Sequence, residues 1–347
     1  MRTNKAKYNL IIITLLILLI FSIGLFTTIG TAKVGVLDIF KIIGSKIPLL
    51  KGHIDISNIA DSAKSIIWNI RLPRVLLGAI IGASLSVAGA AFQGMFKNPM
   101  ADPYVIGISS GAALGAAIAI VLKINISFFT VSPITIFAFI GALLAVFTVY
   151  NIARVKNKVP VTTLLLAGVA VGQFLTAIMS FIMIISDKDM VKITYWTLGS
   201  LTGKGWDPVL GIFIPSIVCI IVICFFARDL NILLTGEESA QSLGVDVERT
   251  KTYILLLGTF ITAISVSVSG IIGFVGLIIP HIVRLLIGPD HRILLPASAL
   301  LGSIFMIFAD TIARTLISPI EIPVGIITAL FGGPFFIYLL RSKKKSI

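Results

Sequence analysis

Residues 227–251 read ARDLNILLTGEESAQSLGVDVERTK. This polar stretch separates two apolar runs, Val209–Phe226 and Thr252–Ser269, each long enough to cross a bilayer. It carries five of the fifteen acidic residues of the chain, and no comparable stretch occurs elsewhere in the second half. The apolar runs and the polar segment between them therefore predict two membrane spans joined outside the lipid.

The polar stretch also has the signals of a short helix. Thr235 can cap a helix whose first turn holds Glu237 and Glu238, where the helix dipole favours negative charge. Gly244 can end the helix in a left-handed conformation. These signals predict a helix of about two turns within the segment.

This helix has an apolar face of its own. Ala240 and Leu243 are three residues apart and lie on one side of the helix. Outside the membrane, only another protein could cover such a face. We therefore predict a docking helix, and the alternative is a solvated connector.

The composition indicates an integral membrane protein. Of 347 residues, 57% are hydrophobic and 12% are charged, and the mean hydropathy is +1.08, whereas a soluble domain has about 25% charged residues. The apolar runs are too long for barrel strands and lack alternation, which predicts an all-α, polytopic chain. Cys219 and Cys224 fall within one apolar run, and we interpret them as packing residues.

Ten spans are predicted, and the first is an uncleaved helix that follows a basic N-terminal segment. They are Leu10–Ile29, Pro73–Gln93, Tyr104–Leu122, Pro133–Asn151, Val161–Ile185, Val209–Ala227, Thr252–Ser269, Ile271–Ile287, Leu294–Ala313 and Pro323–Leu340. An even number of spans places both termini in the cytoplasm and the segment Thr31–Ile70, with its short apolar patches, outside.

Basic residues follow this topology only weakly, because the inner segments hold 16 of the 28 Lys and Arg. Most of the remainder lies in one external segment, at Lys33, Lys41, Lys46, Lys51, Lys64, Arg71 and Arg74. Long external segments are partly exempt from the positive-inside rule. A basic outer face still calls for an explanation.

The two halves of the chain show a faint internal repeat. LLGAIIGASLSVAGAAF at 76–92 resembles LLGTFITAISVSVSGIIGF at 256–274, and VPVTTLLLAG at 159–168 resembles IPVGIITALFG at 322–332. Corresponding copies are five spans apart, so spans 2–5 and 7–10 are predicted to be inverted relative to each other, as in many transporters. Glycines four residues apart, such as Gly78 and Gly82, indicate close helix packing.

Seven strings in order resemble one known family. They are RLPR (71–74), FQGMFKNPMADPYVIGISSGAALG (92–115), YWTLGSL (195–201), GEESAQSLG (236–244), GFVGLIIPHIVRLLIGPDHR (273–292), ADTIAR (309–314) and EIPVGIITALFGGPFFIYLL (321–340). Together they resemble the FecCD family, the permeases of ABC importers for ferric siderophores, haem and cobalamin.

The resemblance implies a type II ABC importer permease fold in one domain, 1–347, with repeat halves at about 71–185 and 250–340 and a cytoplasmic coupling loop at 228–251. It implies a plasma-membrane protein of a bacterium or archaeon. It also implies a second permease subunit, most simply a homodimer, two cytoplasmic ATPases and an external binding protein. No nucleic-acid partner is expected.

Two sets of residues carry roles implied by the resemblance. The motif of the ATPase-coupling helix matches Gly236, Glu237, Glu238, Ala240, Leu243 and Gly244. Arg71, Arg74 and Arg314 match the arginines that receive acidic residues of the binding protein, and guanidinium groups suit carboxylates. The alternative for these arginines is snorkelling at helix ends. Asp310 and Glu321 are expected to orient Arg314.

The chain shows no sign of hydrolysing ATP itself. The string GSLTGKG at 199–205 departs from a phosphate loop in spacing and lacks Ser or Thr after its Lys. We therefore expect no catalytic role, no cofactor and, because the three histidines are scattered, no metal site. ATP is expected to be hydrolysed by the partner chain.

Two rival functions remain. An ion-driven transporter usually needs charged residues at mid-span, and a membrane enzyme needs a nucleophile or a metal cluster; neither is found. The predicted cargo is an iron–siderophore complex, with haem and cobalamin as alternatives.

Overall fold

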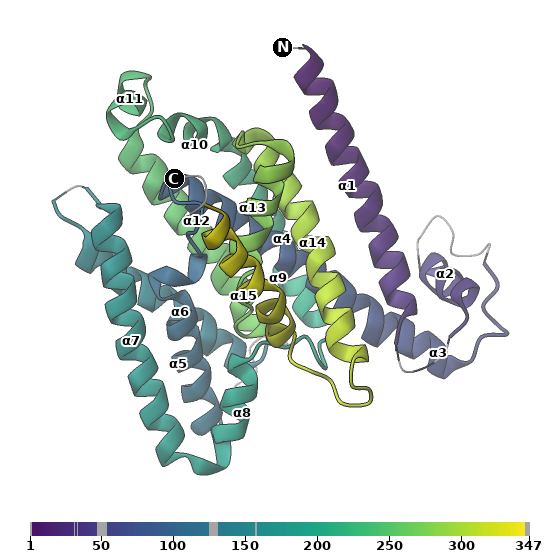
Figure 1. Ribbon diagram of the computed structural model, residues 1–347. Helices are drawn as coiled ribbons and strands as arrows, with labels where there is room; N and C mark the ends of the chain where they lie inside the picture. The colour runs from purple at the N-terminus through teal and green to yellow at the C-terminus, as the bar shows by residue number, and fades with distance from the viewer. Residues whose placement is uncertain are drawn as a thin grey trace.

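The computed structural model describes residues 2–30, 32, 34–46, 54–124, 131–156 and 158–343, so Lys33, Lys51 and the last four residues lie outside the described part. The helices of that part are α1 (Arg2–Thr28), α2 (Val36–Ser45), α3 (Asp61–Ser65), the π-helix η1 (Ile66–Arg71), α4 (Leu72–Met95), the 3-10 helix η2 (Pro103–Ile106), α5 (Ile108–Val121), α6 (Pro133–Ala153), α7 (Val161–Ile185), α8 (Asp187–Thr197), α9 (Trp206–Phe225), α10 (Ala227–Leu233), α11 (Glu237–Ser242), α12 (Val247–Ser269), α13 (Val275–Ile287), α14 (His291–Thr315) and α15 (Val324–Lys343) (Figure 1). The predicted all-α class is confirmed for these residues, whose β pairing is limited to isolated bridges.

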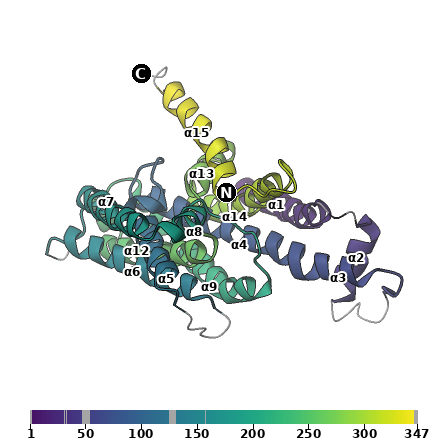
Figure 2. The same ribbon diagram turned by 90° about the horizontal axis from the view of Figure 1, so that it is seen from below.

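Helix α4 is the centre of the bundle. All but two of its 24 residues are buried, and it packs against α14, α12, α13 and α9. A helix that is surrounded on every side needs no polar face, which explains its continuous run of apolar and small residues. Figure 2, which views the bundle from below, shows α4 crossing its full width.

Small residues set how closely the helices approach. A Cβ atom added to Gly111 would lie 2.4 Å from the carbonyl oxygen of Gly141, and one added to Gly115 would lie 2.1 Å from that of Phe137. Any side chain at these two positions would separate α5 from α6. The interpretation of the spaced glycines as packing residues is confirmed here.

Each predicted span coincides with a helix, but not all helices are equally long. Seven are long and apolar enough to cross a bilayer, whereas the apolar parts of α5, α13 and α15 are shorter. Helix α5 has 14 residues, or about 21 Å, against a hydrocarbon thickness of about 30 Å. The chain is a multi-pass membrane protein, and the count of ten spans stays a prediction.

Two predicted spans are wrong at their first residues. Span Tyr104–Leu122 is interrupted at Gly107, which has φ +86°, so η2 and α5 are separate helices. Span Ile271–Ile287 becomes helical only at Val275, after Gly270 and Phe274 with φ +73° and +69°. The first break precedes α5 and the second precedes α13, and these are the second helices of the two predicted repeat halves.

Helix α8 was not predicted. It follows α7 directly, carries charged residues in its first turn and packs along α5. Its low hydropathy makes it resemble a loop in sequence, because the hydrophobic signal of a span is absent. Packing against α5 and α7 stabilises it instead.

The segment that follows α1 contains short helices, and its apolar patches contribute to them. Helices α2, α3 and η1 enclose a small apolar core formed by Ile39, Ile42, Ile59 and Ile67. The ring of Trp68 lies 5.0 Å from that of Trp206, whose Nε1 donates to the Trp68 carbonyl oxygen at 2.8 Å. This contact ties the segment to the start of α9.

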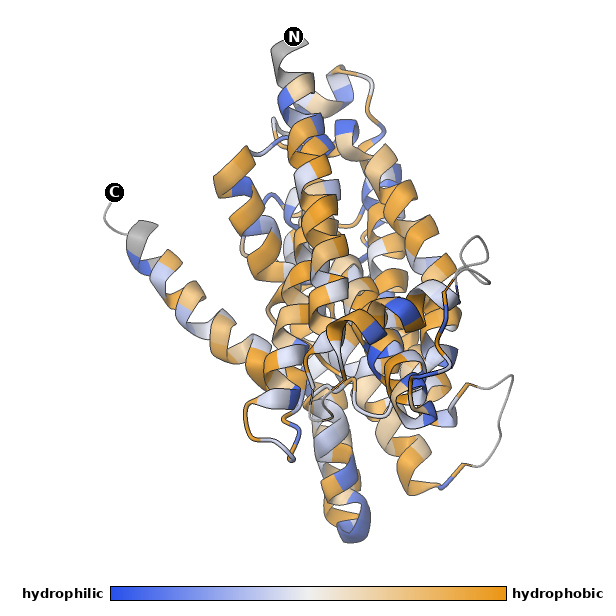
Figure 3. Cartoon of the chain, turned by 90° about the vertical axis from the view of Figure 1, so that its right-hand side faces the viewer, coloured by the Kyte–Doolittle hydropathy of each residue, from blue (hydrophilic) through white to orange (hydrophobic). Residues whose placement is uncertain are grey.

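The bundle has two distinct ends. The start of α1 and helices α10 and α11 lie at the upper end in Figure 1, whereas α3 and the loop after α14 lie towards the lower end. Hydrophobic residues cover much of the length of the helices in Figure 3, and hydrophilic residues gather towards the ends. Helices α1 and α7 are only slightly buried within one chain, so lipid or a partner must cover them.

Candidate functional site

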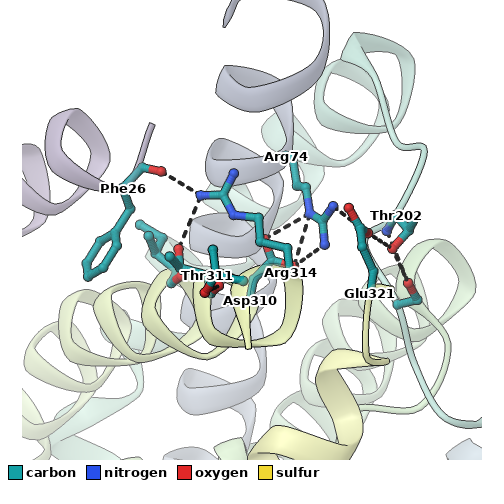
Figure 4. Close-up of polar contacts among 10 residues, drawn as sticks. Phe26, Arg74, Thr202, Asp310, Thr311, Arg314 and Glu321 are labelled. Atoms are coloured by element: carbon teal, nitrogen blue, oxygen red, sulfur yellow. Dashed lines mark hydrogen bonds and ion pairs between the residues drawn. The ribbon is translucent and has the colours of Figure 1, made fainter. Parts of the chain in front are cut away.

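The lower end of the bundle holds an ion-pair cluster centred on Arg74. Its Nε lies 2.9 Å from Asp310 Oδ2, its Nη2 lies 2.9 Å from Asp310 Oδ1, and its Nη1 lies 2.9 Å from Glu321 Oε2 (Figure 4). The side chains of Arg74 and Asp310 are 7% and 3% exposed, whereas that of Glu321 is 34% exposed. Arg74 is therefore fully engaged within its own chain.

The register of two helices brings Arg74 and Asp310 together. A Cβ atom added to Gly82 of α4 would lie 2.1 Å from the carbonyl oxygen of Gly302 in α14, so the two backbones touch at this crossing. Arg74 precedes Gly82 by eight residues and Asp310 follows Gly302 by eight. Because the helices run antiparallel, both side chains lie about 12 Å from the crossing, on the same side of it.

Glu321 joins the loop after α14 to the loop before α9. Besides Arg74, it accepts a hydrogen bond from Thr202 Oγ1 at 2.5 Å. Partial burial raises the pKa of Glu321, but the hydrogen bond from Thr202 and the charge of Arg74 outweigh that effect, so the pKa lies below its ordinary value of 4.5. The carboxylate is therefore charged at neutral pH and holds three segments together.

Arg71 and Arg314 bind the end of α1. Arg314 Nη2 donates to the Phe26 carbonyl oxygen at 2.5 Å, and Arg71 Nη1 donates to that of Thr28 at 3.1 Å. The last carbonyl groups of a helix have no intrahelical partner and carry partial negative charge, so cations are favourable there. A Cβ atom on Gly30 would lie 2.6 Å from Arg71 Nη2, so a side chain there would require the Arg71 guanidinium to shift.

The structure brings all three predicted arginines around one cavity of about 180 Å³. Arg71, Arg74 and Arg314 are each less than 10% exposed. Sequence reasoning expected Asp310 and Glu321 to orient Arg314, but both carboxylates bond to Arg74 instead, while Arg314 donates to the end of α1. The role of the arginines in docking stays a prediction.

At the opposite end of the bundle, the predicted docking helix exists as α11, with two corrections. Its N-cap is Gly236, and the Thr235 hydroxyl donates back to the Ile232 carbonyl oxygen at 2.8 Å, so Thr235 does not cap it. Gly244 has φ +84° and ends the turn as predicted.

The second correction concerns the apolar face of α11. Ala240 is 0% exposed and packs into the core of its own chain, where Leu230 and Leu233 of α10 also lie. Leu243 follows the helix and is 62% exposed. Only Leu243 is therefore available to a partner, because tertiary packing divides the predicted face.

An ion pair attaches α11 to α12. Lys251 Nζ lies 2.7 Å from Glu237 Oε1 and 3.3 Å from Glu248 Oε1. The Lys251 side chain is 9% exposed and that of Glu237 is 44% exposed. Of the two adjacent glutamates, Glu237 is thus used within the chain, and Glu238 is exposed to the surroundings.

Sequence reasoning missed Asn231, which links the segment to α14. Its Oδ1 accepts from the backbone N–H of His291 at 2.8 Å and lies 2.8 Å from His291 Nδ1, while its Nδ2 donates to Asp290 Oδ1 at 2.6 Å. A single Asn in a polar stretch gives no signal of such a role, since its partners lie about 60 residues away.

Comparisons with known proteins identify the family of this chain. Residues 14–342 match the FecCD transport family. The chain is 50% identical over 286 residues to the cobalamin import system permease protein of Halobacterium salinarum, covering 82% of this chain and 76% of the relative. It is 41% identical over 290 residues to the hemin transport system permease protein of Yersinia pestis, covering 80% and 84%.

A longer alignment and a solved structure extend the match. The chain is 37% identical over 344 residues to an Fe(3+)-citrate import system permease protein of Bacillus subtilis, covering 98% of this chain and 96% of the relative. It also resembles a chain of an inward-facing, metal-chelate type ABC transporter, with a TM-score of 0.81, 29% identity, and coverage of 96% and 99%. The chain therefore belongs to the FecCD transport family.

Proposed function

We propose that this chain is the permease subunit of an ATP-driven importer, which passes a metal chelate from an external binding protein into the cytoplasm. The observation that carries the proposal is the structural match, which covers nearly the whole of both chains and is to a transporter of metal-chelate type. The family match over residues 14–342 supports the same class.

The proposed cargo is an iron complex of the siderophore type. Relatives named for iron citrate and iron hydroxamate align over nearly the whole of this chain. Cobalamin is a specific second candidate, because the 50% identical relative is a cobalamin permease. All of these cargoes enclose a metal ion in an organic ligand, and haem does so too.

The proposed subunit has ten spans and works as a homodimer with two separate ATPase subunits. The chain breaks at Gly107 and before Val275 support the inverted repeat, since they fall at corresponding places in its two halves. The proposed topology places both termini and α11 in the cytoplasm and the segment from α2 to η1 outside.

Within this machine, α11 is the proposed coupling element and the arginine cluster is the proposed docking region. Exposed Glu238 and Leu243 support the first assignment, because both are free to meet an ATPase. The cavity between the three arginines supports the second, since guanidinium groups favour carboxylates.

Reconstitution tests the proposal. The permease should co-purify with an ATPase, and proteoliposomes holding both should accumulate a ferric siderophore or cobalamin when the binding protein and ATP are supplied. Uptake driven by an ion gradient without any ATPase would contradict it.

Cysteine labelling tests the topology separately. In a background with Cys219 and Cys224 replaced by Ala, a membrane-impermeant reagent should label Ser62→Cys in intact cells and leave Ser239→Cys unlabelled. The reverse pattern would overturn the assignment of sides.

A further inference from the structure

The cavity between Arg71, Arg74 and Arg314 carries an excess of positive charge. Among the described residues, the carboxylates in contact with these arginines are Asp310 and Glu321, and both bond to Arg74. The other two guanidinium groups contact neutral acceptors, namely backbone carbonyl groups and the Thr311 hydroxyl. Three positive charges therefore face two negative ones.

One of these guanidinium groups has an unused donor. Arg314 is 7% exposed, and its Nε is buried with no hydrogen-bond partner among the described residues. A buried donor without a partner is unfavourable, and a buried charge without compensation is more so. The Arg314 side chain also lines the cavity, so its charge lies beside that space.

The cavity is large enough to hold a ligand. Its volume of about 180 Å³ compares with the roughly 30 Å³ that one water molecule occupies in the liquid. Besides the three arginines, the described lining residues are Gly30, Ala32, Ile66, Ile70 and Glu321, and the Glu321 carboxylate is already paired with Arg74. Water could fill this space but could not offset the charge.

We propose that this cavity binds one small oxyanion between the guanidinium groups of Arg314 and Arg71, which both line it. Guanidinium groups suit this ligand class because their planar N–H donors match the oxygen spacing of phosphate and carboxylate. The site does not depend on the transport function. If the docking proposal is also correct, the bound anion competes with an acidic side chain of the binding protein.

Inorganic phosphate is the probe that tests the site on the purified full-length permease complex, without binding protein. The thermal unfolding midpoint is followed as phosphate is titrated at constant ionic strength, with a bulky sulfonate as the replacement anion. A saturable rise is expected for the wild type, because a ligand that binds the folded state stabilises it. No rise in the wild type would overturn the proposal.

Three variants locate the effect. Arg314→Gln should weaken the apparent phosphate affinity at least about tenfold, as expected for a lost charge-assisted hydrogen bond. Lys64→Gln, which removes a partly buried cation paired with Asp61 in the same external segment, should leave the affinity unchanged. An equal loss in both variants would mean that phosphate acts through general surface charge.

The third variant, Ile70→Glu, tests the site independently in case Arg314→Gln does not fold. Ile70 lines the cavity and is 55% exposed, so Ile70→Glu can supply a tethered carboxylate without emptying a core position. This variant should unfold at or above the wild-type midpoint and lose the response to phosphate. A full phosphate response in Ile70→Glu would contradict the proposed location.

The lipid composition of the nanodisc distinguishes the two possible natural ligands, a lipid headgroup and a free anion. Loss of the phosphate response in phosphatidylglycerol nanodiscs, but not in phosphatidylcholine nanodiscs, would support the site and identify a lipid headgroup as its occupant. An equal response in both would support a free anion.

Discussion

Arg74 and Asp310 form a two-pronged buried ion pair across 236 residues of sequence, with N–O distances of 2.9 Å on both prongs. The pair joins the first turn of α4 to the last turns of α14. Since α4 is the centre of the bundle and α14 its main packing partner, the pair fixes the lower end of the crossing. Two halves of the chain are thereby held in one register.

Breaking this pair should destabilise the protein strongly. Asp310→Asn removes the buried carboxylate that pairs with Arg74 through two contacts, and the expected loss is about 3–5 kcal/mol because Glu321 alone compensates the buried charge only in part. The measurement is the free energy of unfolding in detergent. Asp61→Asn, which removes the solvent-exposed carboxylate of the Lys64–Asp61 pair, is the control and should lose little stability because solvent screens this pair. Similar losses in the two variants would show that burial adds nothing to the Arg74 pair.

The docking proposal predicts a graded effect of charge at Arg71 and Arg314. Both are better test positions than Arg74, which maintains the fold. Arg314→Glu should weaken binding of the loaded binding protein by about 2–5 kcal/mol, and Arg314→Ala should weaken it less because it adds no repulsion. Affinity for the reconstituted transporter is measured over a salt series, and wild-type binding should fall as exposed charges are screened beyond roughly 8–10 Å. Unchanged affinity at low salt would leave the arginines with a structural role alone.

The contrast between Leu243 and Ala240 predicts two different failures. Leu243 is exposed, so Leu243→Asp should leave a folded permease that assembles poorly with its ATPase, at a loss of about 2 kcal/mol or more if the residue is a hot spot. Ala240 is fully buried, so Ala240→Asp should disrupt α11 and its packing on α10. Gel filtration and ATPase co-purification separate the outcomes. Normal assembly of Leu243→Asp would remove α11 from the coupling role.

The hydrogen bonds of Asn231 to α14 predict that its loss weakens the coupling of ATP hydrolysis to transport but has little effect on assembly with the ATPase. Asn231→Ala removes the hydrogen bonds to His291 and Asp290, and about 1–3 kcal/mol of local stability should be lost where these groups stay buried. The ratio of cargo transported to ATP hydrolysed should fall. Ser242→Ala is the matched control, since its hydroxyl bonds only within α11. An unchanged ratio in Asn231→Ala would confine the link to a packing role.

Asp102 predicts a dependence on pH. Burial raises the pKa of this carboxyl to about 6 from an ordinary value of 3.8, although its hydrogen bond from the Tyr104 N–H opposes the shift. The folded state therefore binds the proton more tightly than the unfolded state does. Stability is greatest below the ordinary pKa and falls as pH rises through about 6, by at most about 3 kcal/mol.

Unfolding measured from pH 4 to pH 8 checks this expectation. Asp102→Asn cannot titrate, so its stability should lose this component of the pH dependence. A wild-type profile parallel to that of Asp102→Asn would contradict the raised pKa.

The two candidate sites differed in how far sequence could predict them. Arg71, Arg74 and Arg314 were found by motif and charge, and the structure places them around one cavity. Asp310 and Glu321 were assigned to Arg314, whereas they bond to Arg74, because the packing of α1 against α14 engages the Arg314 side chain elsewhere. In α11 the helix and its Gly244 end were predictable from local signals, whereas the burial of Ala240 was not.

The sequence by itself determined the class of this protein. Hydrophobic runs of bilayer length, separated by polar segments, require internally satisfied helices, and the glycine spacing indicates how closely those helices pack. These are local properties, each specified within about twenty residues. Tertiary structure alone decided the breaks at Gly107 and before Val275, the existence of α8, and the pairing of Arg74 with Asp310. Each of these depends on contacts between distant segments, where the register of two packed helices brings together side chains that no local pattern relates.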